Sequence, residues 1–245
     1  MATGSHFGPA YGYHARVQPA SAPLARIEAV AFDVGGTLIR PWPSVGHVYA
    51  EVAARHGLPN LAPEVLAGRF RLVWAKKQHL AETRAGWEQV VDEAFAGLAP
   101  IPPSQSFFPA LYQRFAEPDV WRPYDDVPPV LDGLAAAGFR LAVISNWDER
   151  LRGLLRRLGL DSRFEALVVS CEVGHRKPDR AIFDEAVRKL ALPAGRILHI
   201  GDSPEMDLQG ARNAGFQALQ IDRDAAAGGP DHLASMFELL ERLRR

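Results

Sequence analysis

The sequence of 245 residues is poor in cysteine, in net charge and in long hydrophobic runs. Its single cysteine, Cys171, excludes a disulfide framework within the chain and favours a reducing compartment. With 28 basic and 29 acidic residues, the formal net charge is −1, which excludes a nucleic-acid binder that depends on a global basic charge. No apolar run approaches the roughly 20 residues that span a bilayer. We therefore expect a cytoplasmic protein with neither membrane nor nucleic-acid partners.

The first 27 residues also lack acidic side chains, and they are rich in Gly, Ala, Pro and His. They contain no apolar stretch of the kind that a secretory signal requires. We interpret residues 1–27 as a disordered leader, with a short transit peptide as the alternative. Ordered structure is expected to begin at residue 28.

Beyond residue 139, short apolar runs alternate with helical patterns. Together with the run that opens the ordered chain, strands are predicted over 28–33, 139–144, 164–169, 196–200 and 217–221. Helices are predicted over 148–158, 179–190, where Asp179 is a candidate N-cap, and 205–214. A closing helix places one apolar stripe at Leu233, Met236, Phe237, Leu240 and Leu243. Strands separated by helices predict an α/β fold, a doubly wound parallel sheet (Rossmann-like core) covered on both faces.

Residues 44–116 interrupt this pattern directly after the first strand. Their apolar positions recur at helical spacing, as at Leu66, Phe70, Val73 and Trp74. We therefore predict an all-helical cap over residues 44–116. It is inserted into an α/β core formed by residues 28–43 and 117–245.

Four polar clusters follow predicted strands, and ligands bind beyond the carboxyl ends of the strands in such sheets. An acid at the end of an apolar strand is costly to bury unpaired. Asp33 is therefore a candidate nucleophile or metal ligand, with the polar boundary of a strand as the alternative. The clusters are Asp33, Ser145 with Asn146, the loop of Lys177, and the run from Gly201 to Asp207.

The residues of the first three clusters are suited to binding an anion. Gly35 and Gly36 let main-chain N–H groups converge, and Thr37 adds a hydroxyl donor. Ser145 and Asn146 offer further donors, although such residues are also common in strand-to-helix turns. A loop lysine such as Lys177 is more often exposed to solvent.

The last cluster indicates a metal. Asp202 and Asp207 lie five residues apart around a predicted helix start, with no basic residue between them. Oxygen ligands of this kind suit a Mg²⁺ ion that also binds a phosphate. Asp207 has the alternative role of complementing the helix dipole.

Taken in order, the four clusters resemble the motifs of the haloacid dehalogenase-like hydrolase superfamily, from about residue 28 to residue 221. The surroundings of Ser145 and Lys177 are similar to those of subfamily I, which has a helical cap after the first motif. The matching motifs are Asp33-Val-Gly-Gly-Thr37, Ser145-Asn146, Lys177-Pro178 and Gly201-Asp-Ser-x-x-x-Asp207.

The resemblance implies a Mg²⁺-dependent phosphatase that acts on a small phosphorylated molecule. Asp33 would attack phosphorus and form an aspartyl-phosphate, which water then hydrolyses. Asp207 would orient a metal-bound water or Lys177. The implied metal site comprises Asp33, the Gly35 carbonyl, Asp202 and Asp207. The groups implied around the phosphoryl oxygens are Lys177, Ser145, Asn146, Gly36 and Thr37.

Gly35 departs from the family pattern, which has a second Asp as general acid and base at that position. General acid–base help is typically worth about 10²–10⁴-fold in rate. We therefore expect the chain to depend on activated leaving groups, on water, or on a cap residue such as His47.

Three alternatives stay open. Metal-free 2-haloacid dehalogenases also lack the second Asp, but they carry Tyr at the position of Gly35 and a different fourth motif. The Asp33 loop is also similar to the phosphate loop of actin-fold sugar kinases, which need a β-hairpin after it. Loss of the acid fits a catalytically weak relative that binds a phosphate or a partner. Both a monomer and a homodimer are compatible with the apolar cap helices.

Overall fold

A computed structural model describes residues 26–243, and the predicted leader as far as residue 25 lies outside these described residues. Six parallel strands form one sheet in the order β5-β4-β1-β6-β7-β8. The central position of β1 places the residue that follows it between the ends of β4 and β6. The strands are β1 Ala29–Phe32, β4 Arg140–Ser145, β5 Ala166–Val169, β6 Ile197–Gly201, β7 Gln217–Ile221 and β8 His232–Leu233.

Helices cover both faces of this sheet, which confirms the predicted doubly wound α/β fold. Val30 and Phe32 of β1 pack against α5, α6 and α10, whereas Ala29 and Ala31 face α8 and α9. The two sets separate because side chains alternate between the faces of a strand. The helices are α5 Val127–Ala136, α6 Leu151–Arg157, α7 Ser170–Val173, α8 Arg180–Leu190, α9 Gly210–Asn213 and α10 Met236–Leu243.

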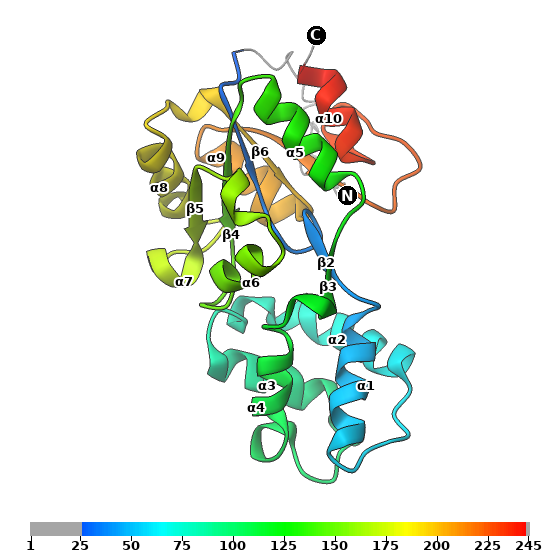
Figure 1. Ribbon diagram of the computed structural model, residues 1–245. Helices are drawn as coiled ribbons and strands as arrows, with labels where there is room; N and C mark the ends of the chain where they lie inside the picture. Colours follow the sequence, from blue (N-terminus) through cyan, green and yellow to red (C-terminus); the bar gives the residue numbers. More distant parts are fainter. Residues whose placement is uncertain (1–25, 244–245) are drawn as a thin grey trace, which may run out of the picture.

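Four further helices lie together beyond one end of the core (Figure 1). They are α1 Val45–Arg55, α2 Pro63–Lys77, α3 Arg84–Ala94 and α4 Phe108–Arg114. They share a hydrophobic cluster of their own, which includes Tyr49, Leu66, Val90 and Phe95. We call α1 to α4 the cap. Among the described residues, none of the helices has both the length and the apolar character that crossing a bilayer requires.

Two strands outside the sequence-based prediction connect the cap to the core. β2 (Ile39–Pro41) and β3 (Trp121–Pro123) pair in antiparallel fashion. Each has three residues and ends in proline, so neither carries a readable alternating pattern. Because the partner of β2 follows the cap, no hairpin comes directly after the Asp33 loop. The sugar-kinase alternative therefore lacks the element that it requires.

An acidic side chain caps α8, which follows β5 and α7, whereas α6, which follows β4, has no side-chain cap. Asp179 accepts a hydrogen bond from the N–H of Ala181 at 3.0 Å, which confirms it as the N-cap of α8. The predicted helix over 148–158 instead begins at Leu151. Asp148 Oδ1 accepts bonds from the N–H and Nε of Arg150 at 3.1 and 2.9 Å, and these bonds hold residues 148–150 in a turn.

The last two predicted helices also differ from the structure. The helix predicted over 205–214 is a π-helix, η6 (Pro204–Gln209), followed by α9. In the closing segment Leu233 belongs to β8 rather than to the helix. The helix α10 begins only at Met236, Phe237 is 52% exposed, and Leu239 rather than Phe237 lies on the buried face. The remaining short turns are the 3₁₀ segments η1 Gln78–Leu80, η2 Pro103–Gln105, η3 Pro118–Val120, η4 Asp161–Arg163 and η5 Ala194–Arg196.

A buried carboxylate at the start of α5 binds the C-terminal part of the core. Asp126 accepts two hydrogen bonds from Arg223 Nη1 at 2.8 and 2.7 Å. It also accepts one bond each from Ser235 Oγ and the N–H of Met236, both at 2.8 Å. Burial raises the pKa of Asp126, but these bonds outweigh burial and hold it below its usual range. The carboxylate therefore stays ionised and joins α5 to α10.

We expect Asp126→Ala to lower the free energy of unfolding by about 3–5 kcal/mol, because it leaves Arg223 without its carboxylate partner in a largely buried position. Urea denaturation at pH 7 measures this effect. The matched control is Asp125→Ala, which removes an exposed carboxylate paired with Arg122 and should cost less than about 1 kcal/mol. Equal losses in the two variants would contradict the role assigned to Asp126.

Candidate active site

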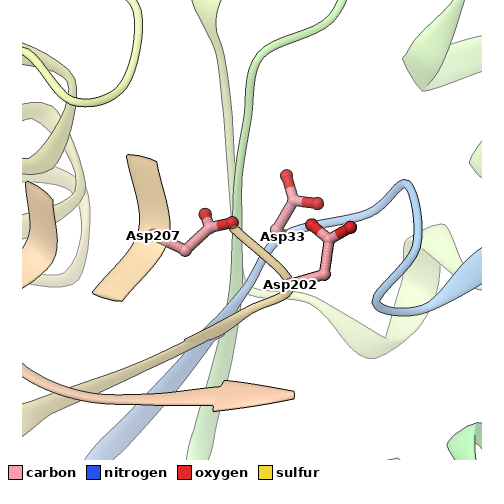
Figure 2. Close-up of side chains that lie close together, drawn as sticks. All are labelled: Asp33, Asp202 and Asp207. Carbon is pink, nitrogen blue, oxygen red and sulfur yellow. The ribbon is translucent and has the colours of Figure 1, made fainter. Parts of the chain in front are cut away.

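The four predicted clusters meet at the carboxyl end of the sheet. Asp33 follows β1, Ser145 ends β4, and Asp202 and Asp207 follow β6. Oxygen atoms of Asp33, Asp202 and Asp207 lie within 4.8 Å of one another. Figure 2 shows these three carboxylates converging from separate segments of the chain. Lys177 reaches the same point from the loop before α8.

Asp33 has one oxygen held by donors and one oxygen free. Its Oδ1 accepts hydrogen bonds from Ser145 Oγ at 3.0 Å and from Lys177 Nζ at 2.7 Å. Its Oδ2 accepts no hydrogen bond from residues 26–243. Burial, with a further contribution from Asp207, raises the pKa of Asp33, and Lys177 opposes this shift. The free oxygen is the one available to a ligand.

Lys177 is only 2% exposed, contrary to the expectation for a loop lysine. Its Nζ lies 2.5 Å from Asp207 Oδ1 and 2.7 Å from Asp33 Oδ1. Burial disfavours the ammonium, but the two carboxylates outweigh burial and raise the pKa of Lys177 above its ordinary value. The side chain therefore carries its charge at the centre of the site.

Asn146 holds the main chain of Lys177. Its Oδ1 accepts the N–H of Lys177 at 2.7 Å, and its Nδ2 donates to the carbonyl of Lys177 at 3.0 Å. The sequence-based expectation was that Asn146 donates to a phosphoryl oxygen. In the structure both ends of the amide are instead bonded to the main chain of Lys177.

Both oxygens of Asp207 are already bonded. Oδ1 binds Lys177 and lies 2.9 Å from Nε2 of the fully buried His199, and Oδ2 accepts the N–H of Ser203 at 3.0 Å. Burial raises the pKa of Asp207, but Lys177 and His199 outweigh burial and lower it well below its usual range. His199 was absent from the sequence-based candidates. The feature of the sequence that could have indicated it is a single histidine within an otherwise apolar strand.

Asp202 is exposed toward the site and has no partner for its carboxylate among the described residues. Loss of hydration within the cleft, together with the carboxylates of Asp33 and Asp207, raises its pKa to about 7. A Cβ at Gly36 would lie 2.3 Å from Asp202 Oδ2, and Gly36 also has a φ of +77°. Only glycine therefore lets the Asp33 loop approach this carboxylate.

These oxygens form a donor set that fits Mg²⁺. Asp33 Oδ2 and the Asp202 carboxylate are free, and the carbonyl of Gly35 accepts no hydrogen bond within residues 26–243. Hard oxygen ligands, waters included, are those that Mg²⁺ prefers. Asp207, implied as a fourth ligand, has both oxygens occupied by Lys177, His199 and Ser203. Asp207 therefore holds Lys177 beside the site, and its oxygens are not free in the way that those of Asp33 and Asp202 are.

The donors of the Asp33 loop are not those expected from the sequence. The N–H of Gly36 donates to Ile39 O at 2.9 Å, and the N–H of Thr37 donates to Val34 O at 3.3 Å. Thr37 is fully buried, its Oγ1 has no partner among the described residues, and it does not line the cavity that opens from Asp33. Within the described part of the chain, the N–H groups of Val34 and Gly35 have no acceptor. The unpaired main-chain N–H groups of this loop are thus those of Val34 and Gly35, whereas the predicted donors Gly36 and Thr37 are bonded within the loop.

Trp147 covers the position at which the family's general acid would stand. A Cβ built on Gly35 would lie 3.2 Å from Cζ3 of the Trp147 indole. The indole packs in turn on Trp121, with 5.3 Å between ring centroids. An apolar ring therefore adjoins Gly35 where a carboxylate would otherwise project.

A cavity of about 340 Å³ opens from Asp33 toward the cap. We call it the aromatic chamber. His47 is not among its lining residues; it is exposed at the start of α1, where Nδ1 lies 2.8 Å from Ser44 Oγ. The proposed substitute acid from the cap is therefore wrong for His47. Nine aromatic side chains line the chamber: Tyr49, Phe70, Trp74, Trp87, Phe108, Tyr112, Phe115, Trp121 and Trp147.

The cations that line the aromatic chamber all have carboxylate partners. Arg150 Nη2 lies 2.5 Å from Asp148, and Arg176 Nε lies 2.9 Å from Glu82. Lys177, the third lining cation, is held by the carboxylates at its base. The chamber thus offers an apolar surface without an unpaired positive charge.

The sequence is similar to those of several known proteins. Residues 27–215 match the family described as haloacid dehalogenase-like hydrolase. The chain is 30% identical over 232 residues to haloacid dehalogenase-like hydrolase domain-containing protein 3 of Danio rerio, over 88% of this chain and 96% of that protein. A glyceraldehyde 3-phosphate phosphatase of Methanothermobacter thermautotrophicus is 34% identical over 118 residues, 46% of this chain and 50% of that protein.

Two solved structures share the fold. The HAD-hydrolase YfnB of Bacillus subtilis bound to magnesium has a TM-score of 0.73 at 20% identity, over 90% of this chain and 100% of that one. L-2-haloacid dehalogenase of Xanthobacter autotrophicus has a TM-score of 0.67 at 20% identity, over 89% of this chain and 98% of that one. Because a magnesium-bound hydrolase and a haloacid dehalogenase share this fold, the fold alone does not distinguish phosphoryl from haloacid chemistry.

Proposed function

The chain belongs to the haloacid dehalogenase-like hydrolase family, and from this premise we propose that it is a Mg²⁺-dependent phosphatase of a small phosphorylated molecule. One observation carries the proposal. The carboxylate of Asp202 lies within 4.8 Å of the carboxylates of Asp33 and Asp207 and accepts no hydrogen bond from another described residue. Burial raises the pKa of Asp202, and the charges of Asp33 and Asp207 add to this shift, so a bound cation would stabilise the ionised carboxylate. A phosphoryl group is the usual companion of such a cation.

Asp33 is the proposed nucleophile. One of its carboxylate oxygens attacks phosphorus, the bond from phosphorus to the leaving oxygen breaks, and an aspartyl-phosphate forms. Water then attacks this phosphorus and releases inorganic phosphate, which restores the Asp33 carboxylate. Lys177 and Ser145 already donate to Asp33 Oδ1, so they are within reach of oxygens on a phosphoryl group bound there.

The remaining residues hold this machinery in place. The free N–H groups of Val34 and Gly35 are additional donors to a phosphoryl oxygen. Asp207 and Asn146 fix Lys177 by its side chain and by its main chain respectively. The residues that would hold Mg²⁺ are Asp33, Asp202 and the Gly35 carbonyl, and the chemistry supplied by the bound ion is electrostatic neutralisation of the phosphoryl charge.

The same observations argue against the haloacid dehalogenase alternative. A 2-haloacid carries a carboxylate, and the three cations of the aromatic chamber are already paired. A metal-free site would also leave three carboxylates facing one ammonium, with Asp202 uncompensated. Both features disfavour binding of a 2-haloacid carboxylate at this site in the absence of a metal ion.

Phosphate release from p-nitrophenyl phosphate tests the proposal. We expect EDTA to lower the rate by about 10²-fold or more, because removing the cation removes several kcal/mol of charge stabilisation. Asp202→Asn should raise the Mg²⁺ concentration for half-maximal rate by at least about tenfold, whereas Glu205→Gln, an exposed acid of the same segment, should not change it. Turnover insensitive to EDTA and to Asp202→Asn would contradict the metal role. The absence of turnover would favour the alternative of a relative that binds a phosphate or a partner without hydrolysing it.

A further inference from the structure

The leaving group of the proposed reaction departs without a proton donor from the protein at position 35. Gly35 has no side chain, and the Trp147 indole occupies the adjoining space. A leaving oxygen that receives no proton must leave as an anion, so it must belong to a group that is acidic in its protonated form. A phenol loses its proton about six pKa units more readily than water does. This site therefore favours phenol-like leaving groups over alkyl alcohols.

The wall of the aromatic chamber suits a flat ring. Phe70, Trp74 and Trp87 form a continuous stack, with ring centroids 5.4 and 5.5 Å apart and interplanar angles of 26° and 22°. Aromatic pairs in such arrangements add to the free energy gained from burial. The chamber volume of about 340 Å³ lies at the small end of ligand pockets, which begin near roughly 300 Å³.

The charges around the chamber exclude a second anionic group. Arg150 and Arg176 are neutralised by Asp148 and Glu82, so a carboxylate on the substrate would enter an apolar site without a counter-ion. The hydroxyl of Tyr49, in contrast, has no hydrogen-bond partner among the described residues, and Tyr49 lines the chamber. A neutral oxygen on the ring would therefore be tolerated, whereas a charged group would not.

We propose that the substrate is an aryl phosphate, a phosphate monoester of a neutral aromatic alcohol whose ring binds in the aromatic chamber. This inference rests on the proposed phosphatase function. An Asp33 oxygen forms a bond to phosphorus, the bond between phosphorus and the aryl oxygen breaks, and its electron pair leaves on the phenolate. The phenolate takes its proton from water after release, and a second water hydrolyses the aspartyl-phosphate.

Comparison of phenyl phosphate with acetyl phosphate and 2-phosphoglycolate tests this proposal. Acetyl phosphate has a still better leaving group than phenyl phosphate but no ring. Comparing the two substrates therefore distinguishes recognition of the ring from the quality of the leaving group. We expect kcat/KM for phenyl phosphate to exceed that of each competitor by at least tenfold. Equal values for phenyl and acetyl phosphate, or a preference for 2-phosphoglycolate, would overturn the substrate class and leave the phosphatase intact. No hydrolysis of any of the three would overturn the phosphatase itself.

A variant of the stack provides the second measurement. Trp74→Ala should lower kcat/KM for phenyl phosphate about tenfold, with a smaller loss for acetyl phosphate, and Trp74→Phe should restore most of it. Leu72→Ala, on the exposed side of α2 at 69% exposure, is the control. Quenching of tryptophan fluorescence by p-nitrobenzylphosphonate reports binding without turnover. Equal losses for both substrates in a folded Trp74→Ala, or no quenching in the wild type, would contradict ring binding.

Discussion

Replacing Asp33 with Asn is expected to abolish Mg²⁺-dependent phosphate release, with a loss on the order of 10⁶-fold, the scale seen when a hydrolase loses its nucleophile. The amide is a poor nucleophile and carries no charge for a metal. Lys177 and Ser145 keep their positions, because Asp207 still holds Lys177 and the oxygen of the introduced amide can still accept their hydrogen bonds. The loss therefore reports the nucleophile rather than a collapse of the site. Phosphate release from p-nitrophenyl phosphate at saturating Mg²⁺ measures it.

The same variant is expected to be at least as stable as the wild type when no metal is bound. Three carboxylates face one ammonium, and the pKa of Asp33 is raised in the folded protein, mainly by burial. A carboxyl whose folded pKa exceeds its unfolded value destabilises the fold as pH rises above the unfolded value. A neutral amide removes this cost at pH 7. A thermal melt in EDTA is the check, and a lower midpoint for Asp33→Asn would show that its pairing with Lys177 stabilises the fold.

Much of the core could be predicted because central parallel strands are buried on both faces and appear as continuous apolar runs. β7 was predicted at both ends, and β1, β4 and β6 within a residue or two. The strands β2, β3 and β8 have two or three residues each, too few to show a period. Their position depends on contacts with distant segments, and no local pattern encodes those contacts.

The candidate site likewise has features that could be predicted from the sequence and features that could not. Asp33, Ser145, Lys177 and Asp202 follow strands that the topology brings to one edge, so their proximity could be inferred from strand order. The sequence does not show, however, which atoms of these residues face a ligand. The turn that links Gly35 to Ile39 is what commits the N–H groups of Gly36 and Thr37 to internal bonds. Likewise, the aromatic chamber collects rings from all the helices of the cap, from β3 and from connecting segments, and no stretch of sequence contains enough of them to be noticed.

Gly35 and Trp147 together account for the missing general acid, the feature in which this site differs from the family pattern. The sequence alone predicts that Gly35→Asp would restore a general acid. In the structure, the first atom of that side chain would lie 3.2 Å from the Trp147 indole, closer than most Cβ contacts. The indole is held by Trp121, so it has limited room to give way. The carboxylate and the ring therefore compete for one space, and restoring the acid requires a change at both positions.

The double variant Gly35→Asp with Trp147→Leu is expected to raise kcat/KM for an alkyl phosphate such as glycerol phosphate by about 10²-fold or more, within the range of general acid catalysis. An alkoxide needs a proton as it leaves, whereas a phenolate does not, so hydrolysis of phenyl phosphate should gain little. The ratio of the two kcat/KM values is the measurement, and Trp147→Leu alone is the control. An equal gain for both substrates would indicate a general improvement in binding. No gain for glycerol phosphate in the folded double variant would show that a missing acid does not limit this site, and the preference for phenol-like leaving groups would then need another cause.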